Sequence, residues 1–371
     1  MCEENQTQVT QIRLLGFQSL SKYKPLLFLL LTLSYICILA GNLLIILLVT
    51  TIDHLKIPMF LFLKHLSIAD VLLTTSVIPM MLDIAIEEEG VMSLWGCLLQ
   101  LFAFGIFGFI QCLIIAVMSC DRYLAICHPL RYSSLMTPDL CLRLVIGSWC
   151  LVIGLISSEF FVIIQFNFCG LNSIDHFFCD FSPILQMVSS DISIFILQDL
   201  VYSIFLVFFP FSLIIISYFC IFVNILKISS TNGRRKAFST CSSHLTTVCV
   251  YYGSLIAVYI TPSDESSSNI NKYRSLLYLV VTPLLNPIIY SLRNNEIKRA
   301  MQKMRKKALK TLGFKKTMSV LRYFLKTQQT DKKGIQLTPA GNGRIQKNDK
   351  QLEVLLTEMC VRTLAMVTEE E

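Results

Sequence analysis

An aspartate stands in the middle of a long apolar stretch of this sequence. Asp70 lies near the centre of the mainly apolar segment 57–82. A carboxylate in an apolar environment is costly and is usually paired or functional. Asn42 and Asn286 fall at similar depths in two other apolar segments, which predicts a shared polar cluster. The cluster could bind a cation or water and rearrange when the helices move. Alternatively, it could be a hydrogen-bonded network that only determines how the helices pack.

A pair of opposite charges, Asp121 and Arg122, follows directly after the uncharged stretch 90–120. Arg122 is too close to that stretch to be an ordinary loop charge, and the adjacent carboxylate can neutralise it. Breaking the pair would free Arg122 for another partner, which is the physics of a two-state switch. Tyr123 completes the tripeptide.

Proline in a helix removes one hydrogen bond and frees a carbonyl group. Asn286-Pro287, with Tyr290 one turn later, therefore predicts a hinge in the last long apolar segment.

The elements that must position these residues are helices in a membrane. Hydrophobic residues make up 54% of the 371-residue chain and charged residues only 15%, against about 25% charged in soluble domains. Crossing a bilayer takes about 20 apolar residues in a helix. Seven segments meet or approach that length: 25–52, 57–82, 90–120, 140–161, 200–226, 237–263 and 275–292. We expect an all-α membrane protein with a seven-transmembrane helix bundle.

The charges beside the spans predict the orientation, since basic loops stay in the cytoplasm. Basic residues gather at 227–236 and 293–310, whereas 83–89 is acidic and 159–199 has no Lys or Arg. The N-terminus is therefore expected outside and the C-terminus inside. The basic run favours a short interfacial amphipathic helix on anionic lipid. The predicted parts are an extracellular segment 1–24, a receptor domain 25–292, the helix 293–310 and a cytoplasmic tail 311–371.

The outer face is an oxidising setting. Four of the 14 cysteines are predicted there, namely Cys2, Cys97, Cys169 and Cys179. A disulfide between Cys97 and Cys179 is favoured over free thiols and would hold the long outer loop over the bundle. Asn5 begins an Asn-Gln-Thr glycosylation acceptor on the same face.

Several motifs occur in order along residues 5–310. They are Gly41-Asn42, Pro58-Met59-Phe60, Met118 to Tyr132 (MSCDRYLAICHPLRY), Ser217-Tyr218, Lys236 to Leu245 (KAFSTCSSHL) and Pro283 to Asn294 (PLLNPIIYSLRN). With these motifs the chain resembles an olfactory receptor of the rhodopsin-like G protein-coupled class. The resemblance implies a receptor for small volatile or apolar molecules that activates a stimulatory, olfactory-type G protein and raises cyclic AMP. It also implies the plasma membrane of olfactory neuron cilia.

By analogy, the ligand would lie in the outer half of the bundle, where an apolar pocket suits a small hydrophobic molecule. The residues implied for its wall are Phe104, Gly105, Gly108, Phe109, Tyr202, Leu206, Ile256, Tyr259 and Leu279. We expect no acid in this region, which argues against amine ligands. The residues implied for the G protein switch are Asp121, Arg122, Tyr123, Tyr218, Asn286, Pro287 and Tyr290.

The chain departs from the family pattern at four places. Gln111 replaces a glutamate in the inner polar cluster (Asn42, Asp70, Gln111 and Asn286), Cys120 replaces a tyrosine, and Ser189 stands where a further cysteine is usual. The loss of that cysteine makes a second bridge within the loop doubtful. The tail 311–371 is also atypical. We expect a disordered or aberrantly translated segment rather than a regulatory extension.

Other functions fit less well. A non-olfactory chemosensory receptor would share every motif and differ by tissue. A transporter would favour internal repeats and midplane ion-path residues. An enzyme would need a nucleophile and base or a set of metal ligands. We expect no enzyme activity, no cofactor and no metal. We also expect no nucleic-acid partner, because the basic residues lie beside the membrane.

Overall fold

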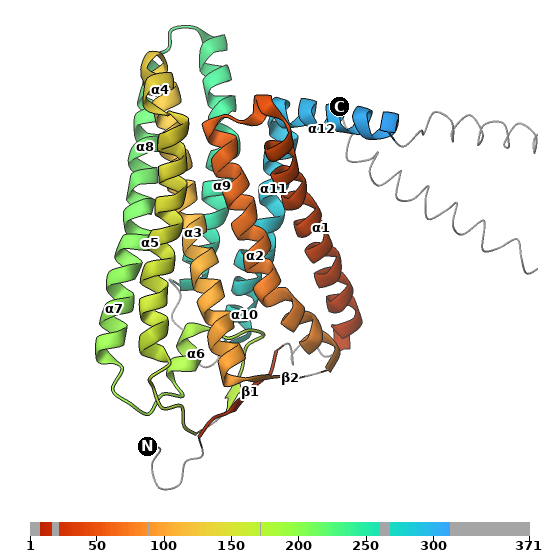
Figure 1. Cartoon of the computed structure of the whole chain (residues 1–371), viewed down its shortest axis with the longest axis vertical. Coiled ribbons are helices and arrows are strands. Elements are labelled where there is room, and N and C mark those ends of the chain that lie inside the picture. The colour runs from red at the N-terminus through yellow and green to blue at the C-terminus, as the bar shows by residue number, and fades with distance from the viewer. Residues whose placement is uncertain (1–7, 17–21, 88, 171, 260–267, 312–371) are drawn as a thin grey trace, which may run out of the picture. The chain divides into compact units, whose positions relative to one another are not determined.

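The computed structural model describes residues 8–16, 22–87, 89–170, 172–259 and 268–311. Cys2, Asn5 and the tail from residue 312 lie outside these ranges. Within them, helices form seven rods side by side (Figure 1). The first four rods are α1 (Lys24–Thr51), α2 (Pro58–Glu87), α3 (Leu94–Cys127) and α5 (Pro138–Ile163). The fifth joins α7 (Ser193–Ser203), a π-helical turn η3 (Ile204–Phe208) and α8 (Phe209–Lys227).

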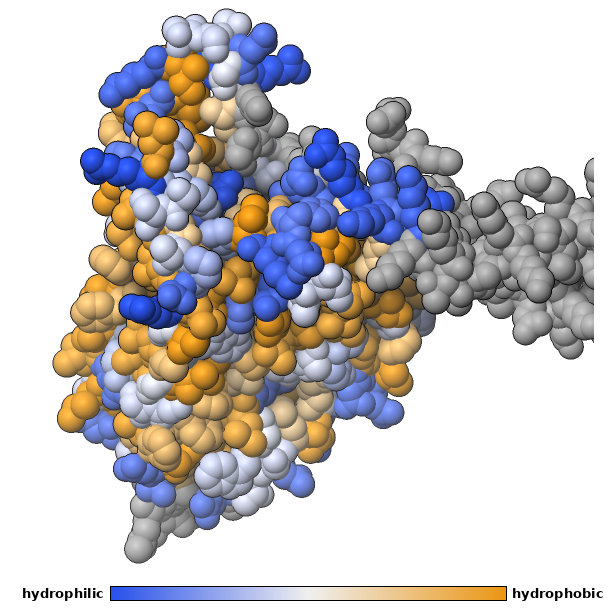
Figure 2. Space-filling model, turned by 45° about the horizontal axis from the view of Figure 1, so that its top comes forward, coloured by the Kyte–Doolittle hydropathy of each residue, from blue (hydrophilic) through white to orange (hydrophobic). Residues whose placement is uncertain are grey.

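The sixth rod is α9 (Thr231–Tyr259), and the seventh joins α10 (Ser268–Leu276), a π-helical turn η5 (Leu277–Val281) and α11 (Thr282–Arg293). Among the described helices, the first five rods are long and apolar enough to cross a membrane by length and composition alone. The other two complete the bundle. Figure 2 shows an apolar flank, which suits contact with lipid, and hydrophilic residues gathered toward the cytoplasmic end.

Helix ends follow local sequence signals. Ser93 caps α3 by accepting a hydrogen bond from the Gly96 N–H at 3.0 Å, and Thr137 caps α5 in the same way, ahead of Pro138. Hydroxyl N-caps satisfy N–H groups that a helix start leaves free. At its other end, α3 continues through Asp121 and Arg122 to Cys127. The expected end at Asp121-Arg122-Tyr123 is one turn too early, because no Gly or Pro stands between Cys120 and Pro129.

Each π-helical turn precedes a proline. Pro210 and Pro283 have no N–H, and a proline ring collides with the carbonyl group four residues earlier in a regular helix. Those earlier residues are Leu206 in η3 and Leu279 in η5. The wider turn relieves both problems, so these prolines shape the fifth and seventh rods where they line the outer half of the bundle.

A small sheet at the extracellular end modifies the expected all-α fold. Its strands are β1 (Gln11–Leu14), β2 (Gly90–Ser93) and β3 (Ser173–Ile174), in the order β2-β1-β3. The central strand pairs antiparallel with β2 and parallel with β3. Ile12 and Leu14 point inward and are fully buried. The sheet therefore ties the N-terminal segment and the long outer loop across the end of the bundle (Figure 1).

In the described loops lie the short helices η2 (Asp53–Leu55), α4 (Pro129–Leu135) and α6 (Phe181–Leu185). At the end opposite the sheet, α11 is followed directly by α12 (Asn295–Thr311). Its start is capped by Asn294, whose side-chain oxygen accepts the Glu296 N–H at 2.9 Å. Ile297 and Ala300 are buried, while Lys298, Arg299 and Lys303 are exposed. This amphipathic pattern suits a helix lying at the membrane surface.

Candidate functional site

The buried carboxylate of Asp70 has two amide partners. Gln111 donates from Nε2 to Oδ1 at 2.8 Å, and Asn286 donates from Nδ2 to Oδ2 at 2.9 Å. Tyr278 donates to the Gln111 oxygen at 3.3 Å. Asp70 and Gln111 are fully buried and Asn286 is nearly so. The contacts join α2, α3 and the seventh rod, so movement of that rod must exchange hydrogen bonds at this carboxylate.

Asn42, the fourth predicted member of this cluster, contacts a different group. Its amide donates to the Pro283 carbonyl at 3.1 Å, which is the acceptor that Pro287 leaves without an N–H in a helix. Gly41 allows the approach, since a Cβ atom there would lie 2.8 Å from the Pro287 ring. Gly41-Asn42 and Asn286-Pro287 thus form a matched contact between α1 and α11.

At the cytoplasmic end, Arg122 is closed off by its neighbour. Its guanidinium forms an ion pair with Asp121, with the Nε bond at 3.0 Å. Tyr132, from the short helix α4, donates to the other Asp121 oxygen at 2.7 Å. Arg122 is only 9% exposed, so neither group is offered to a partner in this conformation. Tyr123 turns away and its hydroxyl lies 3.2 Å from His128.

Two further predicted switch residues surround this pair. The Tyr218 hydroxyl lies 2.6 Å from His244 Nδ1, which links α8 to α9. Tyr290 of α11 is fully buried. Arg122 is close enough for its charge to act on both tyrosines and on His244. The cytoplasmic halves of α3, α8, α9 and α11 therefore meet around one arginine.

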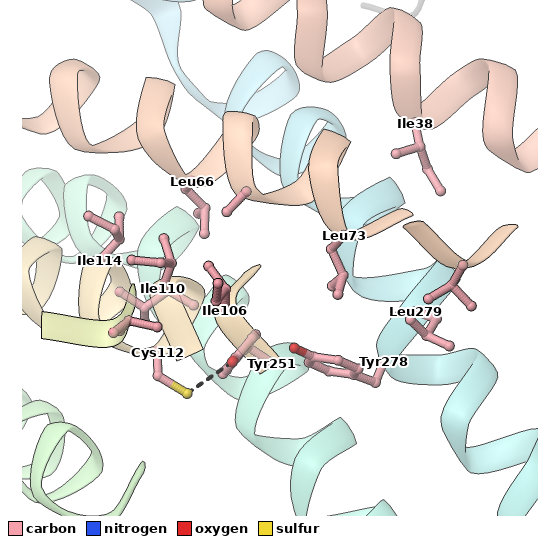
Figure 3. Packing of buried hydrophobic residues seen from close by; sticks show 14 of the residues in the cluster. Ile38, Leu66, Leu73, Ile106, Ile110, Cys112, Ile114, Tyr251, Tyr278 and Leu279 are labelled. Carbon is pink, nitrogen blue, oxygen red and sulfur yellow. Dashed lines mark hydrogen bonds between the residues drawn. The ribbon is translucent and has the colours of Figure 1, made fainter. Parts of the chain in front are cut away.

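A small cavity lies in the outer half of the bundle, beneath the long outer loop. Its volume is about 10 Å³, which is roughly the space that one water molecule needs. A ligand of several carbon atoms must therefore displace side chains to enter. The lining residues are Phe104, Phe178, Asp180, Leu255, Ser275, Tyr278 and Leu279. Figure 3 shows Leu279 and Tyr278 together, with the Tyr278 ring turned toward Tyr251 of α9.

Of the predicted wall residues, Phe104 and Leu279 line this cavity. Gly108 lies behind it, because a Cβ atom there would meet the Tyr278 hydroxyl at 2.6 Å. Gly105 instead faces Ile156 of α5. Leu206 is fully buried in η3.

The remaining predicted wall residues lie elsewhere. Phe109 is half-buried against the core. Tyr202 hydrogen-bonds Ser158 of α5 at 2.8 Å and does not line the cavity. Ile256 is 46% exposed on the outside of α9. Its neighbour Leu255 takes the inward position. Tyr259 ends α9, and its side chain lies outside the described part of the structure.

Asp180 is the main surprise of the outer region, where we expected no acid. The Cys97–Cys179 disulfide, with Cα atoms 5.4 Å apart, fixes the preceding residue to the start of α3. The Cys179 N–H also donates to Gln100 at 3.0 Å. Both contacts turn the loop inward at Asp180. The sequence signal was its position next to a bridged cysteine.

The rest of the outer loop is held by polar contacts. Lys272 of α10 is 3% exposed and its ammonium lies 2.5 Å from Asp175. Ser275 lies 3.4 Å from His176 Nε2. Burial and the nearby lysine lower the pKa of His176 to about 3, so its ring is neutral. Cys169 is itself disulfide-bonded; the Ser189 hydroxyl lies 3.6 Å from its sulfur.

The bundle, the disulfide from α3 to the outer loop, the buried Asp70 and the arginine at the inner end of α3 define a rhodopsin-like seven-helix receptor. The crystal structure of squid rhodopsin superposes with a TM-score of 0.60, covering 78% of this chain and 87% of that one at 17% identity. That likeness supports the fold.

The family follows from the sequence comparison. The family model described as "Olfactory receptor" matches residues 31–308. "Olfactory receptor 5P81" of Mus musculus is 43% identical over 301 residues, 81% of this chain and 95% of that protein. "Olfactory receptor 11L1" of Homo sapiens is 43% identical over 305 residues, 82% and 95%. The chain belongs to the olfactory receptor family, whose members are G protein-coupled membrane receptors and not enzymes.

Proposed function

We propose that this receptor detects odorants. A small, mainly apolar molecule binds in the outer cavity, and the receptor then activates a stimulatory, olfactory-type G protein that raises cyclic AMP. The observation that carries the proposal is the apolar cavity lined by Phe104, Leu255 and Leu279 beneath the disulfide-held loop. Concave apolar sites with a few polar groups suit such ligands. The proposed location is the plasma membrane of olfactory sensory cilia, with Asn5 glycosylated.

The inner half supplies a mechanism for coupling. Ligand entry must push the walls of a cavity this small apart, and the walls include α9 and the seventh rod. Outward movement of the inner ends of α8 and α9 would separate Tyr218 from His244 and uncover Arg122. Arg122 would then exchange its bond to Asp121 for a contact with the G protein.

The inner surface already offers an apolar anchor. Leu130 of α4 is 97% exposed, and α4 also supplies Tyr132, which bonds Asp121. A protein that buries Leu130 would therefore bind to α4, the helix whose Tyr132 hydrogen-bonds Asp121 while Asp121 is paired with Arg122.

Two neighbouring residues of α9 provide the test. Leu255 lines the cavity and Ile256 faces outward. We expect Leu255→Trp to fill the cavity and abolish the cyclic AMP response to volatile agonists, while Ile256→Trp leaves it within about threefold of the wild type. Surface labelling in transfected cells controls for expression. Equal responses of the two variants would place the ligand elsewhere, and no wild-type response to a broad volatile panel would contradict odorant detection.

A further inference from the structure

We propose that the outer cavity selects ligands whose head group is a protonated amine, with Asp180 as the counter-ion. The inference rests on the proposed function, because it concerns the same cavity, and it narrows the class of ligand. Asp180 is the one acidic residue among the described residues that line this space.

In the described part of the chain, the carboxylate of Asp180 is hydrogen-bonded but has no ion-pair partner. Its Oδ1 atom accepts the Phe181 N–H at 2.8 Å, at the start of α6. No Lys, Arg or His side chain in the described residues forms an ion pair with it. Burial raises the pKa of Asp180, as expected when a charged form loses water and gains no opposite charge.

The cationic side chains of the same outer network are committed or neutral. Lys272 pairs with Asp175 at 2.5 Å. The His176 ring, with its pKa near 3, carries no charge at neutral pH. No side chain in the described residues pairs a positive charge with Asp180, and a ligand that enters the cavity can supply one.

Aromatic rings form much of the remaining cavity wall. Phe104 stacks at a tilt on Phe178 with ring centroids 5.2 Å apart, and meets Tyr278 edge-on at 5.8 Å. The faces of such rings attract cations, and recognition sites for ammonium groups commonly combine several rings. Ser275 adds a hydroxyl group at the cavity wall. Three rings and a carboxylate around one small space match an ammonium group with an apolar tail.

Other head groups fit this arrangement less well. A carboxylate would meet the like charge of Asp180 in a partly dry site, and an aldehyde offers no hydrogen to donate. An alcohol can donate one hydrogen bond to Asp180 but leaves its charge uncompensated. For one carbon skeleton, we therefore expect the amine to bind most tightly, followed by the alcohol and the aldehyde, with the carboxylate weakest.

The probes are primary amines of graded size, each matched by the alcohol, aldehyde and carboxylate with the same carbon skeleton. They are applied to the full-length receptor on transfected cells with a cyclic AMP readout. In the wild type, we expect the best amine to act at a lower concentration than its matched alcohol. Asp180→Asn should raise the half-maximal concentration of that amine by about 30-fold or more, and that of the alcohol by less than about threefold.

Two further acidic-site variants control for the charge change. Asp191→Asn makes the same substitution at an exposed outer residue that does not line the cavity, and it should leave the amine response unchanged. Asp180→Glu keeps the charge and should keep the preference for amines. If Asp180→Asn fails to reach the cell surface, Phe104→Leu replaces it. That variant removes one ring face but keeps apolar bulk, and it should weaken the amine more than the alcohol.

The outcomes separate the inference from the function on which it rests. A wild-type receptor that answers uncharged volatiles but no amine, or an amine response that survives Asp180→Asn at full potency, overturns the amine assignment and leaves odorant detection standing. A surface-displayed receptor that answers neither the matched series nor a broad volatile panel overturns both.

Discussion

The two ends of the bundle are built in different ways. The ion pair that holds Arg122 at the inner end is local in the chain, since Asp121 pairs with the adjacent Arg122 and with Tyr132 of the next short helix. The outer cavity collects its lining from α3, the outer loop, α9 and the seventh rod. A short motif can therefore specify the closed ion pair, whereas the outer cavity depends on how distant segments are folded against one another.

The largest expected effect separates signalling from binding. Arg122→Ala removes the guanidinium group that pairs with Asp121 and that is proposed to contact the G protein. We therefore expect no cyclic AMP response at any agonist concentration. Ligand binding and surface display should persist, because the cavity lies at the other end of the bundle. Radioligand or fluorescent-ligand binding beside the signalling assay checks both. Full signalling by a surface-displayed variant would show that the switch does not depend on Arg122.

The next effect falls on the outer end. Cys97→Ser removes the bridge to Cys179, and loss of a native disulfide typically costs about 2–5 kcal/mol of stability. We expect surface display to fall severalfold, with the ligand response lost as the loop releases Asp180. Cys150→Ser is the control, because Cys150 is a free, exposed thiol on α5. Normal display and response of the Cys97 variant would contradict the role of the disulfide in holding the outer loop.

A packing change tests the contact between α1 and α11. Gly41→Ala places a methyl group 2.8 Å from the Pro287 ring, so one helix must move, at about 1–3 kcal/mol. We expect a lower melting temperature in detergent and altered basal signalling, since Asn286 next to this contact holds Asp70. Gly147→Ala, on open surface of α5, should change neither. Indistinguishable melting of the two variants would mean that the rods do not meet as described.

The smallest effect is a pH dependence at the outer loop. The pKa of His176 is about 3 in the folded receptor, against 6.5 ordinarily. The unfolded state therefore binds a proton that the folded state excludes, and stability falls as the pH drops below about 6.5. At pH 5 the loss is about 2 kcal/mol. His176→Asn should flatten the melting temperature between pH 7 and pH 5. An equal slope in both proteins would assign the dependence to other groups.

The sequence predicts the seven spans, their orientation and the outer disulfide well, because apolar length, flanking charge and compartment are local properties. It predicts sidedness within a span less well. The sequence predicts that Ile256 faces the cavity, but Leu255 does so instead. A span that is apolar on all sides has no polar face, so the sequence does not show which side of the helix faces the bundle. Asp180 was missed for another reason: only the folded-back loop, and no helix pattern, brings it to the cavity.

The order in which the chain is made gives the small extracellular sheet a further consequence. Its first strand to be synthesised, β1, is the central one, and it must wait for β2 and then for β3. Ile174, at the end of β3, reaches the lumen only after four spans have been inserted. Until then β1 keeps unpaired backbone groups on the side that later pairs with β3, and an unpaired strand edge can pair with wrong partners. The sheet can therefore close only after the first four spans have been inserted with both loops on the outer side.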